Sequence, residues 1–288
     1  MIRIAIPNKG RLYEPTISIF NDSGLYINGG AESRKLLAKT VDSEINILFA
    51  RAADIPEYVQ DGAADVGVTG FDLITERGAN VELLLDMGFG KANLVLAVPE
   101  ESEFQDPKFL EGKKIATEFP GITEQYFKKL GINVEVIKVT GACEMTPHVG
   151  IADAIVDISS SGTTLMINHL KAIAQVFSST VYLIANKESL KTKSKVLDIK
   201  TALESVLNAK KHRYLMMNVP ESALNAVKEV LPGMSGPTVM KVESSRSSES
   251  ILAVHAVVDA ALIFTLVNQL KNVGARDILV VPIERIMP

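Results

Sequence analysis

The sequence predicts an α/β fold of two similar lobes, followed by a small C-terminal ferredoxin-like unit. Three observations lead to this fold class. Strand-like and helix-like segments alternate over the first two-thirds of the 288 residues, which is typical of largely parallel sheets. One strand–turn–helix pattern occurs twice in that region. The last segment follows a β-α-β-β-α-β order, the order of a split ferredoxin-like unit.

The alternating region contains short apolar runs bounded by turn residues, which predict strands, and longer periodic segments, which predict helices. The predicted strands are Ile2–Ile6, Glu44–Phe49, Val66–Thr69, Leu94–Val98, Lys114–Thr117, Val134–Lys138, Ala154–Ile158 and Val181–Ala185. The predicted helices are Leu12–Ser23, Ile55–Asp61, Asp72–Arg77, Thr123–Leu130, Thr164–Ala174 and Lys187–Lys211.

The repeated pattern covers residues 58–73 and 147–165. Both copies run through an Ala-Asp pair, an apolar strand, a Thr/Ser-Gly turn and the start of a helix. Two such units indicate two similar lobes that direct their loops toward one cleft, although convergent local pattern remains the alternative. We expect residues 1–95 with 178–211 to form lobe I and residues 96–177 to form lobe II.

The last segment, residues 212–288, has its own rhythm of strands and helices. We expect strands at Tyr214–Val219, Thr238–Val242, Ile251–Val257 and Asp277–Ile283, and helices at Ser222–Val230 and Asp259–Asn272. The basic cluster Lys210–Arg213 precedes this segment and suits the C-terminus of a helix. A domain boundary is therefore expected there.

Composition limits the class of protein. A net charge of −4 argues against a nucleic-acid partner held by bulk electrostatics. The single Cys143 excludes an internal disulfide and a multi-cysteine zinc site. The sequence has no signal-peptide pattern and no apolar run near the ~20 residues of a membrane span. These features predict a cytoplasmic protein. The four histidines lack metal-ligand spacing, and neither a Walker motif nor a dinucleotide fingerprint occurs.

The segment Asp157–Leu165, Asp-Ile-Ser-Ser-Ser-Gly-Thr-Thr-Leu, carries the strongest chemical signal. A buried strand ends in a carboxylate, and a loop of hydroxyls and one glycine leads into a helix N-terminus. Hydroxyls, close backbone N–H groups and the helix dipole all favour a bound phosphate. Asp157 suits ribose hydroxyls or Mg²⁺. A sugar phosphate satisfies both halves, whereas the alternative is a turn whose serines merely cap the helix.

Basic residues follow two other predicted strands. Lys9 and Arg11 flank Gly10 just after the first strand, and Arg51 directly follows the second. Lysine and arginine bind phosphate oxygens, and the carboxyl ends of strands are where ligands enter open α/β sheets. A solvated turn is the alternative.

Two acidic residues lie near these loops. Asp72, in Thr69-Gly-Phe-Asp72, either caps the following helix, which is the safer interpretation, or accepts from a ligand amine. Glu144 precedes the strand that carries Asp157. It either shares ribose hydroxyls or a metal with Asp157, or it is a surface glutamate.

Together these motifs resemble the long form of the ATP phosphoribosyltransferase family, the first enzymes of histidine biosynthesis. The resemblance rests on the segments Pro7–Leu12, Gly67–Leu73, Ile115–Pro120 and Gly141–Leu165, which span most of the chain in the right order. It implies two periplasmic-binding-protein-like (type II) lobes that form a catalytic cleft. The implied reaction is attack of adenine N1 of ATP on C1 of phosphoribosyl pyrophosphate (PRPP), with loss of pyrophosphate and a requirement for Mg²⁺.

The resemblance also assigns residues. The PRPP-binding residues are Glu144, Asp157, Ser159, Ser160, Ser161, Gly162, Thr163 and Thr164. The ATP-binding residues are Lys9, Arg11, Arg51, Gly70, Phe71, Asp72 and Phe119, of which the first three act in catalysis by facing the phosphates. Family members often carry tyrosine in place of Phe119, so stacking is kept but a phenol hydrogen bond is lost. Mg²⁺ is expected mainly on substrate phosphates, with Asp157 or Glu144 as available protein ligands.

The C-terminal unit then resembles the family's regulatory domain, which implies feedback inhibition by histidine, a self-sufficient enzyme and a homo-oligomer, either dimer or hexamer. The implied histidine site consists of Asn218, Gly236, Thr238 and Ala275. Many relatives have an acidic residue where Asn218 stands, so this chain lacks that charge.

Two other functional classes compete with this interpretation. A solute-binding module could use the same two lobes without chemistry, but the sequence lacks a secretion signal. A phosphoribosyltransferase for another nitrogen base would keep Asp157–Thr164 and change lobe I, whereas the motifs around Lys9 and Asp72 favour ATP.

Overall fold

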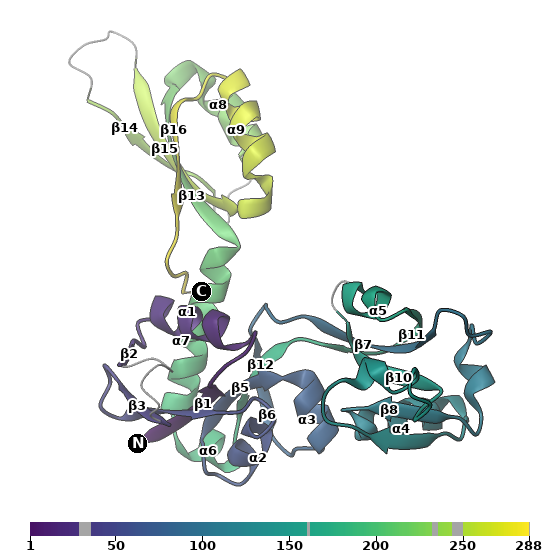
Figure 1. Cartoon of the computed structure of the whole chain (residues 1–288). Coiled ribbons are helices and arrows are strands. Elements are labelled where there is room, and N and C mark those ends of the chain that lie inside the picture. Colours follow the sequence, from purple (N-terminus) through teal and green to yellow (C-terminus); the bar gives the residue numbers. More distant parts are fainter. Residues whose placement is uncertain (29–35, 160–161, 232–235, 244–249, 288) are drawn as a thin grey trace. The chain divides into compact units, whose positions relative to one another are not determined.

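The chain forms two compact units in the computed structural model, which describes residues 1–28, 36–159, 162–231, 236–243 and 250–287. The first unit comprises residues 1–21 and 25–200, and the second comprises residues 22–24 and 201–288 (Figure 1). The predicted α/β class is confirmed. Among the described residues, no helix is long and apolar enough to cross a membrane.

Lobe I of the first unit is built on a seven-stranded sheet in the order β2-β3-β4-β1-β5-β12-β6. Strands β4, β1 and β5 run parallel, and β12 pairs antiparallel with β5 and β6. The strands are β1 (Ile2–Pro7), β2 (Ile27–Asn28), β3 (Leu37–Thr40), β4 (Ile45–Ala50), β5 (Val66–Gly70), β6 (Glu82–Asp86) and β12 (Val181–Ala185). The helices are α1 (Tyr13–Asp22), α2 (Ile55–Gln60), α3 (Phe71–Arg77) and α6 (Lys187–Thr192).

Lobe II is built on a five-stranded sheet in the order β11-β7-β10-β8-β9. Strands β10, β8 and β9 run parallel, whereas β7 is antiparallel to both β10 and β11. The strands are β7 (Ala92–Pro99), β8 (Lys114–Thr117), β9 (Glu135–Lys138), β10 (Ala154–Ser159) and β11 (Leu170–Ser179). Helices α4 (Pro120–Leu130) and α5 (Thr163–Ile167) complete the lobe with the short 3-10 turns η2 (Pro107–Leu110) and η3 (Cys143–Met145).

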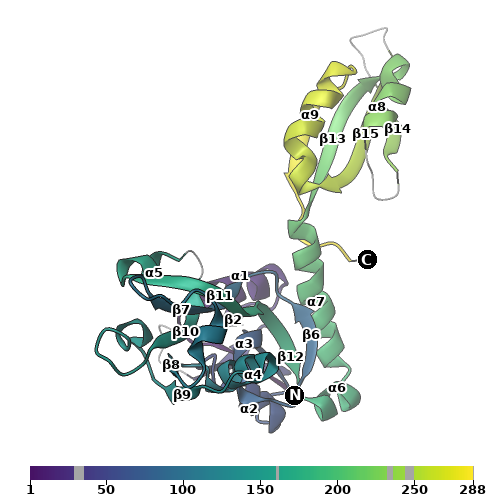
Figure 2. The same ribbon diagram turned by 90° about the vertical axis from the view of Figure 1, so that its right-hand side faces the viewer.

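The chain crosses between the lobes twice, into β7 and out of β11, and then returns to lobe I as β12 (Figures 1 and 2). The lobe II sheet starts at Ala92 and ends at Ser179, so it extends slightly beyond the expected limits of 96 and 177. The boundary between the two compact units falls between Lys200 and Thr201, within α7 (Lys195–Lys210).

The repeated sequence pattern has a structural counterpart in each lobe. Asp65 donates its backbone N–H to the carbonyl of Arg3 at 2.8 Å and accepts the Arg3 N–H with its carboxylate at 2.8 Å. Asp153 does the same with Lys114, at 2.8 and 2.9 Å. In both lobes an aspartate thus fastens the start of a central strand to its parallel neighbour. Convergent local pattern does not predict this shared hydrogen bonding.

One predicted helix is wrong in most of its length. Residues 164–174 were expected to be helical, but α5 spans only Thr163–Ile167, and β11 begins at Leu170. His169 adopts a left-handed conformation with φ of 51° between them, which ends a right-handed helix. Pairing with β7 then overrides the local helix propensity of the alanines in this segment. The predicted helix over 187–211 is likewise divided, into α6 and α7.

The second unit confirms the predicted ferredoxin-like order. Its four-stranded sheet has the order β14-β15-β13-β16, with all neighbours antiparallel. The strands are β13 (His212–Pro220), β14 (Thr238–Lys241), β15 (Ile251–Asp259) and β16 (Arg276–Pro282), and the helices are α8 (Leu224–Val230) and α9 (Ile263–Asn272). The helices follow the 3-10 turns η4 (Glu221–Ala223) and η5 (Ala260–Leu262). Alternate residues of β13 and β15 point into a core shared with both helices.

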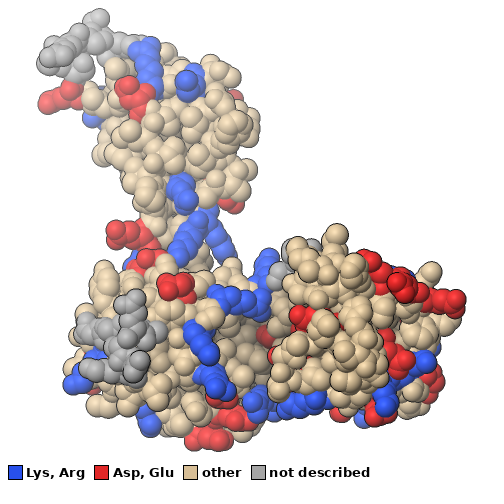
Figure 3. Space-filling model, viewed as in Figure 1, with Lys and Arg blue, Asp and Glu red and all other residues tan. Residues whose placement is uncertain are grey.

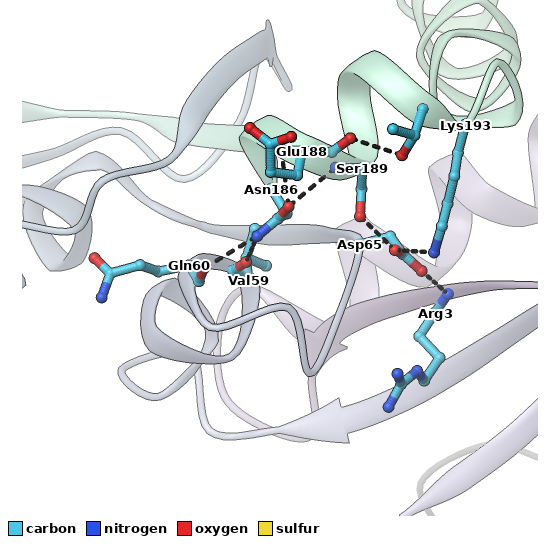
Figure 4. A network of polar contacts seen from close by, with 9 residues as sticks. Arg3, Val59, Gln60, Asp65, Asn186, Glu188, Ser189 and Lys193 are labelled. Carbon is cyan, nitrogen blue, oxygen red and sulfur yellow. Dashed lines mark hydrogen bonds and ion pairs between the residues drawn. The ribbon is translucent and has the colours of Figure 1, made fainter.

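A polar network fixes the returning segment to lobe I (Figure 4). The Asp65 carboxylate accepts from the Ser189 hydroxyl and the Lys193 ammonium, each at 2.6 Å, as well as from the Arg3 N–H. Asn186 caps α6 by accepting from two backbone N–H groups at 3.0 Å, and its amide donates to the carbonyl of Val59 at 2.9 Å. These contacts explain why two separate parts of the sequence share one lobe.

Candidate functional site

Three loops of lobe I meet at one edge of its sheet. Strands β4, β1 and β5 are parallel neighbours, with Pro7 opposite Ala50 and Ala5 opposite Gly67. Their carboxyl ends therefore lead into the loops that carry Lys9 and Arg11, Arg51, and Gly70 to Asp72. The sheet topology thus brings together the predicted ATP-binding segments of lobe I.

The basic side chains of these loops face solvent. Lys9, Arg11 and Arg51 are all exposed. Gly10, with φ of 79°, allows the turn between Lys9 and Arg11. The buried side-chain oxygen of Asn8 has no hydrogen-bond partner within the described residues. A buried acceptor without a donor is costly, so a donor from a bound ligand would stabilise this loop.

The loop residue Asp72 does not cap helix α3 with its side chain. The helix begins after Gly70 without a side-chain cap, so the capping interpretation is wrong. The Asp72 carboxylate is buried and accepts from the Ser179 hydroxyl at 2.6 Å, at the end of β11. A Cβ on Gly70 would lie 2.2 Å from Asp72 Oδ1, so this conformation requires glycine. Asp72 therefore ties the lobe I loop to the strand that returns from lobe II.

The two aromatic residues of the predicted ATP site both have protein partners. Phe71 stacks on Phe177 of β11, with ring centroids 5.5 Å apart. Phe119 is 5% exposed and belongs to the apolar core of lobe II. Stacking of Phe119 on a nucleotide stays a prediction, and it would require this side chain to leave its core position.

The loop after β10 is partly described. Ser159 accepts the Gly162 N–H at 3.1 Å, and Gly162 has φ of 76°. Thr163 and Thr164 open α5, which is five residues long. Ser160 and Ser161 lie outside the described residues. Because α5 is so short, backbone N–H groups and hydroxyls, rather than a long helix dipole, are the donors available here.

Three carboxylates converge at the adjoining carboxyl ends of β8 and β10. Burial, followed by the charges of Glu144 and Glu118, raises the pKa of Asp157 above its ordinary value, although the Ile158 N–H, donated at 2.6 Å, opposes the shift. Glu144 lies on η3, which packs against the strand β10 that carries Asp157. The sequence analysis did not single out Glu118. This residue directly follows β8, and Asp157 lies near the end of the neighbouring strand β10.

The same cluster keeps Cys143 chemically inert. Burial and the nearby carboxylates, Asp157 foremost, raise the pKa of its thiol to about 12. Its Sγ contacts the carbonyl of Ala116 at 3.3 Å. A thiol that remains protonated at neutral pH is a poor nucleophile, so Cys143 acts as a small buried hydrophobe, as expected.

The two lobes therefore offer complementary chemistry. Lobe I presents exposed cations, and Lys and Arg side chains gather over α1 and β1 on the face shown in Figure 3. Lobe II presents carboxylates beside a hydroxyl-bearing loop. In the part of the chain that the structure describes, no group of three or more His, Cys, Asp and Glu side chains is arranged to hold a metal ion.

The predicted histidine site is divided across the C-terminal sheet. Asn218 lies opposite Arg276, next to Ala275, and its amide donates to the Asp277 carboxylate at 2.9 Å. Thr238 lies on β14, at the other edge of the sheet, with Gly236 just before it. Asn218 lies on the inner strand β13, two strand spacings or roughly 10 Å from β14, and Ala275 precedes the edge strand β16, three spacings or roughly 14 Å away. One copy of the sheet therefore does not bring the four predicted residues together.

Comparison with known proteins agrees with the fold. The family model for ATP phosphoribosyltransferase (HisG) matches residues 51–205, and the model for the HisG C-terminal domain matches residues 209–285. An ATP phosphoribosyltransferase of Methanosarcina mazei is 83% identical over 100% of both chains. That of Methanothermobacter thermautotrophicus is 50% identical over 100% of this chain and 99% of its own.

A solved structure gives the same result. The ATP phosphoribosyl transferase (HisG:HisZ) complex from Thermotoga maritima matches with a TM-score of 0.63 and 29% identity, over 71% of this chain and 97% of that chain. Fold and matches together define an enzyme of the pentosyltransferase class. The chain belongs to the ATP phosphoribosyltransferase family of histidine biosynthesis, in the long form that includes the C-terminal domain.

Proposed function

We propose that this chain transfers the 5-phosphoribosyl group of PRPP to N1 of ATP, giving phosphoribosyl-ATP and pyrophosphate with the help of Mg²⁺. The observation that carries the proposal is the packing of η3, which carries Glu144, against β10, which carries Asp157 and leads into a loop of hydroxyls. Carboxylates suit sugar hydroxyls, and the adjoining N–H and O–H donors suit a phosphate.

In this proposal PRPP binds mainly to lobe II. Asp157 and Glu144 accept from the two ribose hydroxyls, and the loop from Ser159 to Thr164 holds the 5′-phosphate. Burial and then the charges of Glu144 and Glu118 raise the pKa of Asp157 in the free protein, and hydrogen bonds donated by the ribose hydroxyls would stabilise its ionised form. PRPP binding should therefore favour ionised Asp157.

ATP and the departing pyrophosphate would bind to lobe I. The side chains of Lys9, Arg11 and Arg51 are exposed at the carboxyl edge of the sheet. They can therefore approach phosphate oxygens without disrupting the protein core. Gly70 to Asp72 and Phe119 are proposed to lie near the nucleotide.

The chemistry needs alignment and charge neutralisation more than proton transfer. Displacement at C1 passes through an oxocarbenium-like state, and pyrophosphate departs with high negative charge. Lys9 and Arg51 stabilise that developing charge, while the two lobes align N1 with C1. Adenine N1 already carries a lone pair, so no strong general base is required. The proposed site accordingly uses cations and carboxylates rather than an acid–base pair.

The residues present fit a magnesium ion bound with substrate. Asp157 and Glu144 offer the oxygen ligands that Mg²⁺ prefers, and both lie on the neighbouring elements β10 and η3. Mg²⁺ would supply charge neutralisation on the pyrophosphate oxygens. One or two protein carboxylates suffice for an ion held largely by phosphates.

The direct test is pyrophosphate release by the purified protein with ATP, PRPP and Mg²⁺. We expect release only when both substrates and the metal are present, and EDTA should abolish it. Release with PRPP alone would indicate hydrolysis rather than transfer. Binding of PRPP without any release on addition of ATP would contradict the proposed acceptor and favour another nitrogen base or a binding module.

We further propose that histidine inhibits the enzyme by binding to the C-terminal units of a homo-oligomer. Asn218 lacks the charge that would hold an amino group, but its amide fixes Asp277, which has φ of 50°, on the adjacent strand. Asp277 can supply that charge. Since Thr238 lies at the opposite edge of the sheet, one ligand would touch both sets only if two copies meet. Dimer or hexamer, and a cytoplasmic location, stay predictions.

Replacing Asp277 tests this regulatory proposal. We expect Asp277→Asn to raise the histidine concentration for half-inhibition by about ten- to hundredfold, because a charge-assisted hydrogen bond to the ligand contributes roughly 1.5–3 kcal/mol. The measurement is a histidine titration of pyrophosphate release, normalised to each variant's uninhibited rate. Glu229→Gln, an exposed change on α8, is the control. Equal half-inhibition in both variants would contradict the role of Asp277.

A further inference from the structure

Helix α3 belongs to lobe I, yet one of its faces binds lobe II. Asp72 accepts from Ser179 at the end of β11, and Leu73 packs against the apolar core of lobe II. Glu76 lies four positions after Asp72 and three after Leu73, so all three share one face of the helix. This face is a contact between the lobes formed by side chains of a single short helix.

Glu76 makes the most directional contact on that face. Its two carboxylate oxygens accept the backbone N–H groups of Gly121 and Ile122, each at 3.0 Å. These donors belong to the first turn of α4, where N–H groups have no partner within the helix. Pro120 occupies the first position of α4 and contributes no N–H. A lobe I carboxylate thus binds the free donors at a lobe II helix start.

The packing around this contact leaves little room. A Cβ on Gly121 would lie 3.3 Å from the backbone carbonyl oxygen of Glu76 and 3.3 Å from Oε2. Glycine at 121 therefore permits the close approach of the two helices. The carboxylate also has the charge that a helix N-terminus favours. Close packing, hydrogen bonding and charge therefore all favour the contact between Glu76 and the start of α4.

Both helices start at the predicted substrate loops. Helix α3 follows Gly70 at the carboxyl end of β5, in the proposed ATP-binding loop. Helix α4 follows Glu118 and Phe119 at the carboxyl end of β8, beside Asp157. The contact between Glu76 and the start of α4 therefore joins the two half-sites through two short, regular segments.

We infer that Glu76 is a positioning residue that sets the separation of the two half-sites, so that substrates held by different lobes react. This inference rests on the proposed function, because a reaction between two bound substrates depends on that separation. In that proposal, PRPP is held mainly by lobe II, so its binding depends on that separation less than the reaction does. Loss of Glu76 should therefore lower turnover more than it weakens the binding of PRPP.

A distance measurement tests the structural part without substrates. Spin labels at Glu82→Cys on β6 and Glu135→Cys on β9 report one position in each lobe, and both sites are exposed. The native Cys143 is buried and should stay unlabelled. We expect Glu76→Ala to shift or broaden the distribution of label separations. Glu124→Gln, which removes an exposed charge from the same helix α4, should leave it unchanged.

Kinetics tests the functional part. We expect Glu76→Ala to lower kcat about tenfold, with the Kd for PRPP within twofold of the original value. Glu76→Gln retains one acceptor oxygen and should recover part of that loss. Gly121→Ala, which crowds the same contact, should resemble Glu76→Ala. A role limited to stability would lower the thermal midpoint without this separation of kcat from binding.

The outcomes distinguish failure of the positioning role of Glu76 from failure of the proposed function. An unchanged label distribution in Glu76→Ala would overturn the positioning role, and so would a shifted distribution with unchanged kcat. If the unmodified protein releases no pyrophosphate from ATP and PRPP, the proposed function fails. The distance experiment would then still decide whether Glu76 holds the lobes.

Discussion

Asp157→Asn is expected to lower turnover by about 10²–10³-fold while making the protein more stable at neutral pH. The loss follows from the removal of the carboxylate proposed to accept from the ribose hydroxyls and to support a magnesium ion. Asparagine keeps the shape and one acceptor oxygen, so the fold should remain intact. Asp157→Ala should abolish turnover in the same way.

The gain in stability follows from the electrostatics of the free protein. Burial and the charges of Glu144 and Glu118 raise the pKa of Asp157 above its ordinary value of 3.8. At neutral pH the ionised carboxylate therefore destabilises the folded state. A neutral amide removes this repulsion. We expect a thermal midpoint about 1–3 °C higher, of the order of 1 kcal/mol or less for a chain of this size.

The effect of Asp157 on stability depends on pH. Below the unfolded-state pKa, Asp157 is protonated in both states and causes no penalty. The penalty grows as the pH rises from the unfolded-state pKa to the raised folded-state pKa, and it is complete above the folded-state value. The stability advantage of Asp157→Asn should therefore be largest near pH 7 and should shrink as the pH falls toward 3.8. Calorimetry at several pH values measures it.

A matched control separates this effect from a general loss of charge. Glu135 is exposed at the amino end of β9 in the same sheet, away from the carboxylate cluster. Glu135→Gln should change neither turnover nor the thermal midpoint appreciably. Unchanged turnover in Asp157→Asn would remove that residue from the site. A lower midpoint at pH 7 would show that its charge is compensated in the folded protein.

The sequence predicts those parts of the fold in which local pattern and tertiary pairing agree. Central strands such as β1 and β10 are buried apolar runs between turn residues, and their positions were predicted to within one residue. The edge strands β2 and β6, and β3 beside β2, were not predicted, because all three are short and β3 and β6 are largely exposed. The first half of strand β11, residues 170–174, was predicted as helix because its alanines carry helix propensity, while its pairing with β7 is a long-range effect.

The residues of the candidate site also fall into two groups: those that could be predicted from the sequence and those that could not. Residues at or just after the end of a predicted strand, such as Asp157 and Arg51, can be found from the sequence, because parallel strands bring their ends to one edge of the sheet. Glu118 satisfies the same rule and could have been found. Asp277 and Glu76 could not, because each acquires its partner from a distant segment: Asp277 binds Asn218, and Glu76 binds the start of α4.

Asp65→Ala is expected to be among the most destabilising single changes in lobe I, although Asp65 lies at the amino end of β5, away from the substrate loops. The carboxylate receives hydrogen bonds from three groups: the Arg3 N–H, the Ser189 hydroxyl and the Lys193 ammonium. Its removal leaves these donors without their acceptor and releases the returning segment from β1. Turnover should fall only as far as the folded fraction falls.

The expected loss of stability in Asp65→Ala depends on the unequal burial of the two partners in the ion pair between Asp65 and Lys193. The Asp65 side chain is 6% exposed, but that of Lys193 is 41% exposed and can regain water. Breaking a fully buried pair costs about 3–5 kcal/mol, so we expect about 2–3 kcal/mol here. That corresponds to a fall in the thermal midpoint of roughly 4–12 °C. Hydrogen exchange of the Arg3 amide, which loses its carboxylate acceptor, should accelerate.

The pH dependence of this stabilisation has the opposite sign to that of Asp157. Burial, the largest single influence, raises the pKa of Asp65, but the hydrogen bonds from Lys193, Ser189 and Arg3 outweigh it and lower the pKa below 3.8. The stabilisation is therefore present above the unfolded-state pKa and is lost as the pH falls through the lower folded-state value. The difference between the two proteins should persist from pH 7 to pH 5 and narrow in stronger acid.

Lobe II contains the natural control for this prediction. Asp153 forms the same two backbone hydrogen bonds with Lys114, but its side chain is 36% exposed, and its ion pair with Lys113 is 3.7 Å long. An exposed pair of this kind contributes about 1 kcal/mol or less. Asp153→Ala should therefore cost clearly less than Asp65→Ala. Equal losses would mean that the shared backbone contacts, rather than the buried network around Ser189 and Lys193, stabilise the lobe.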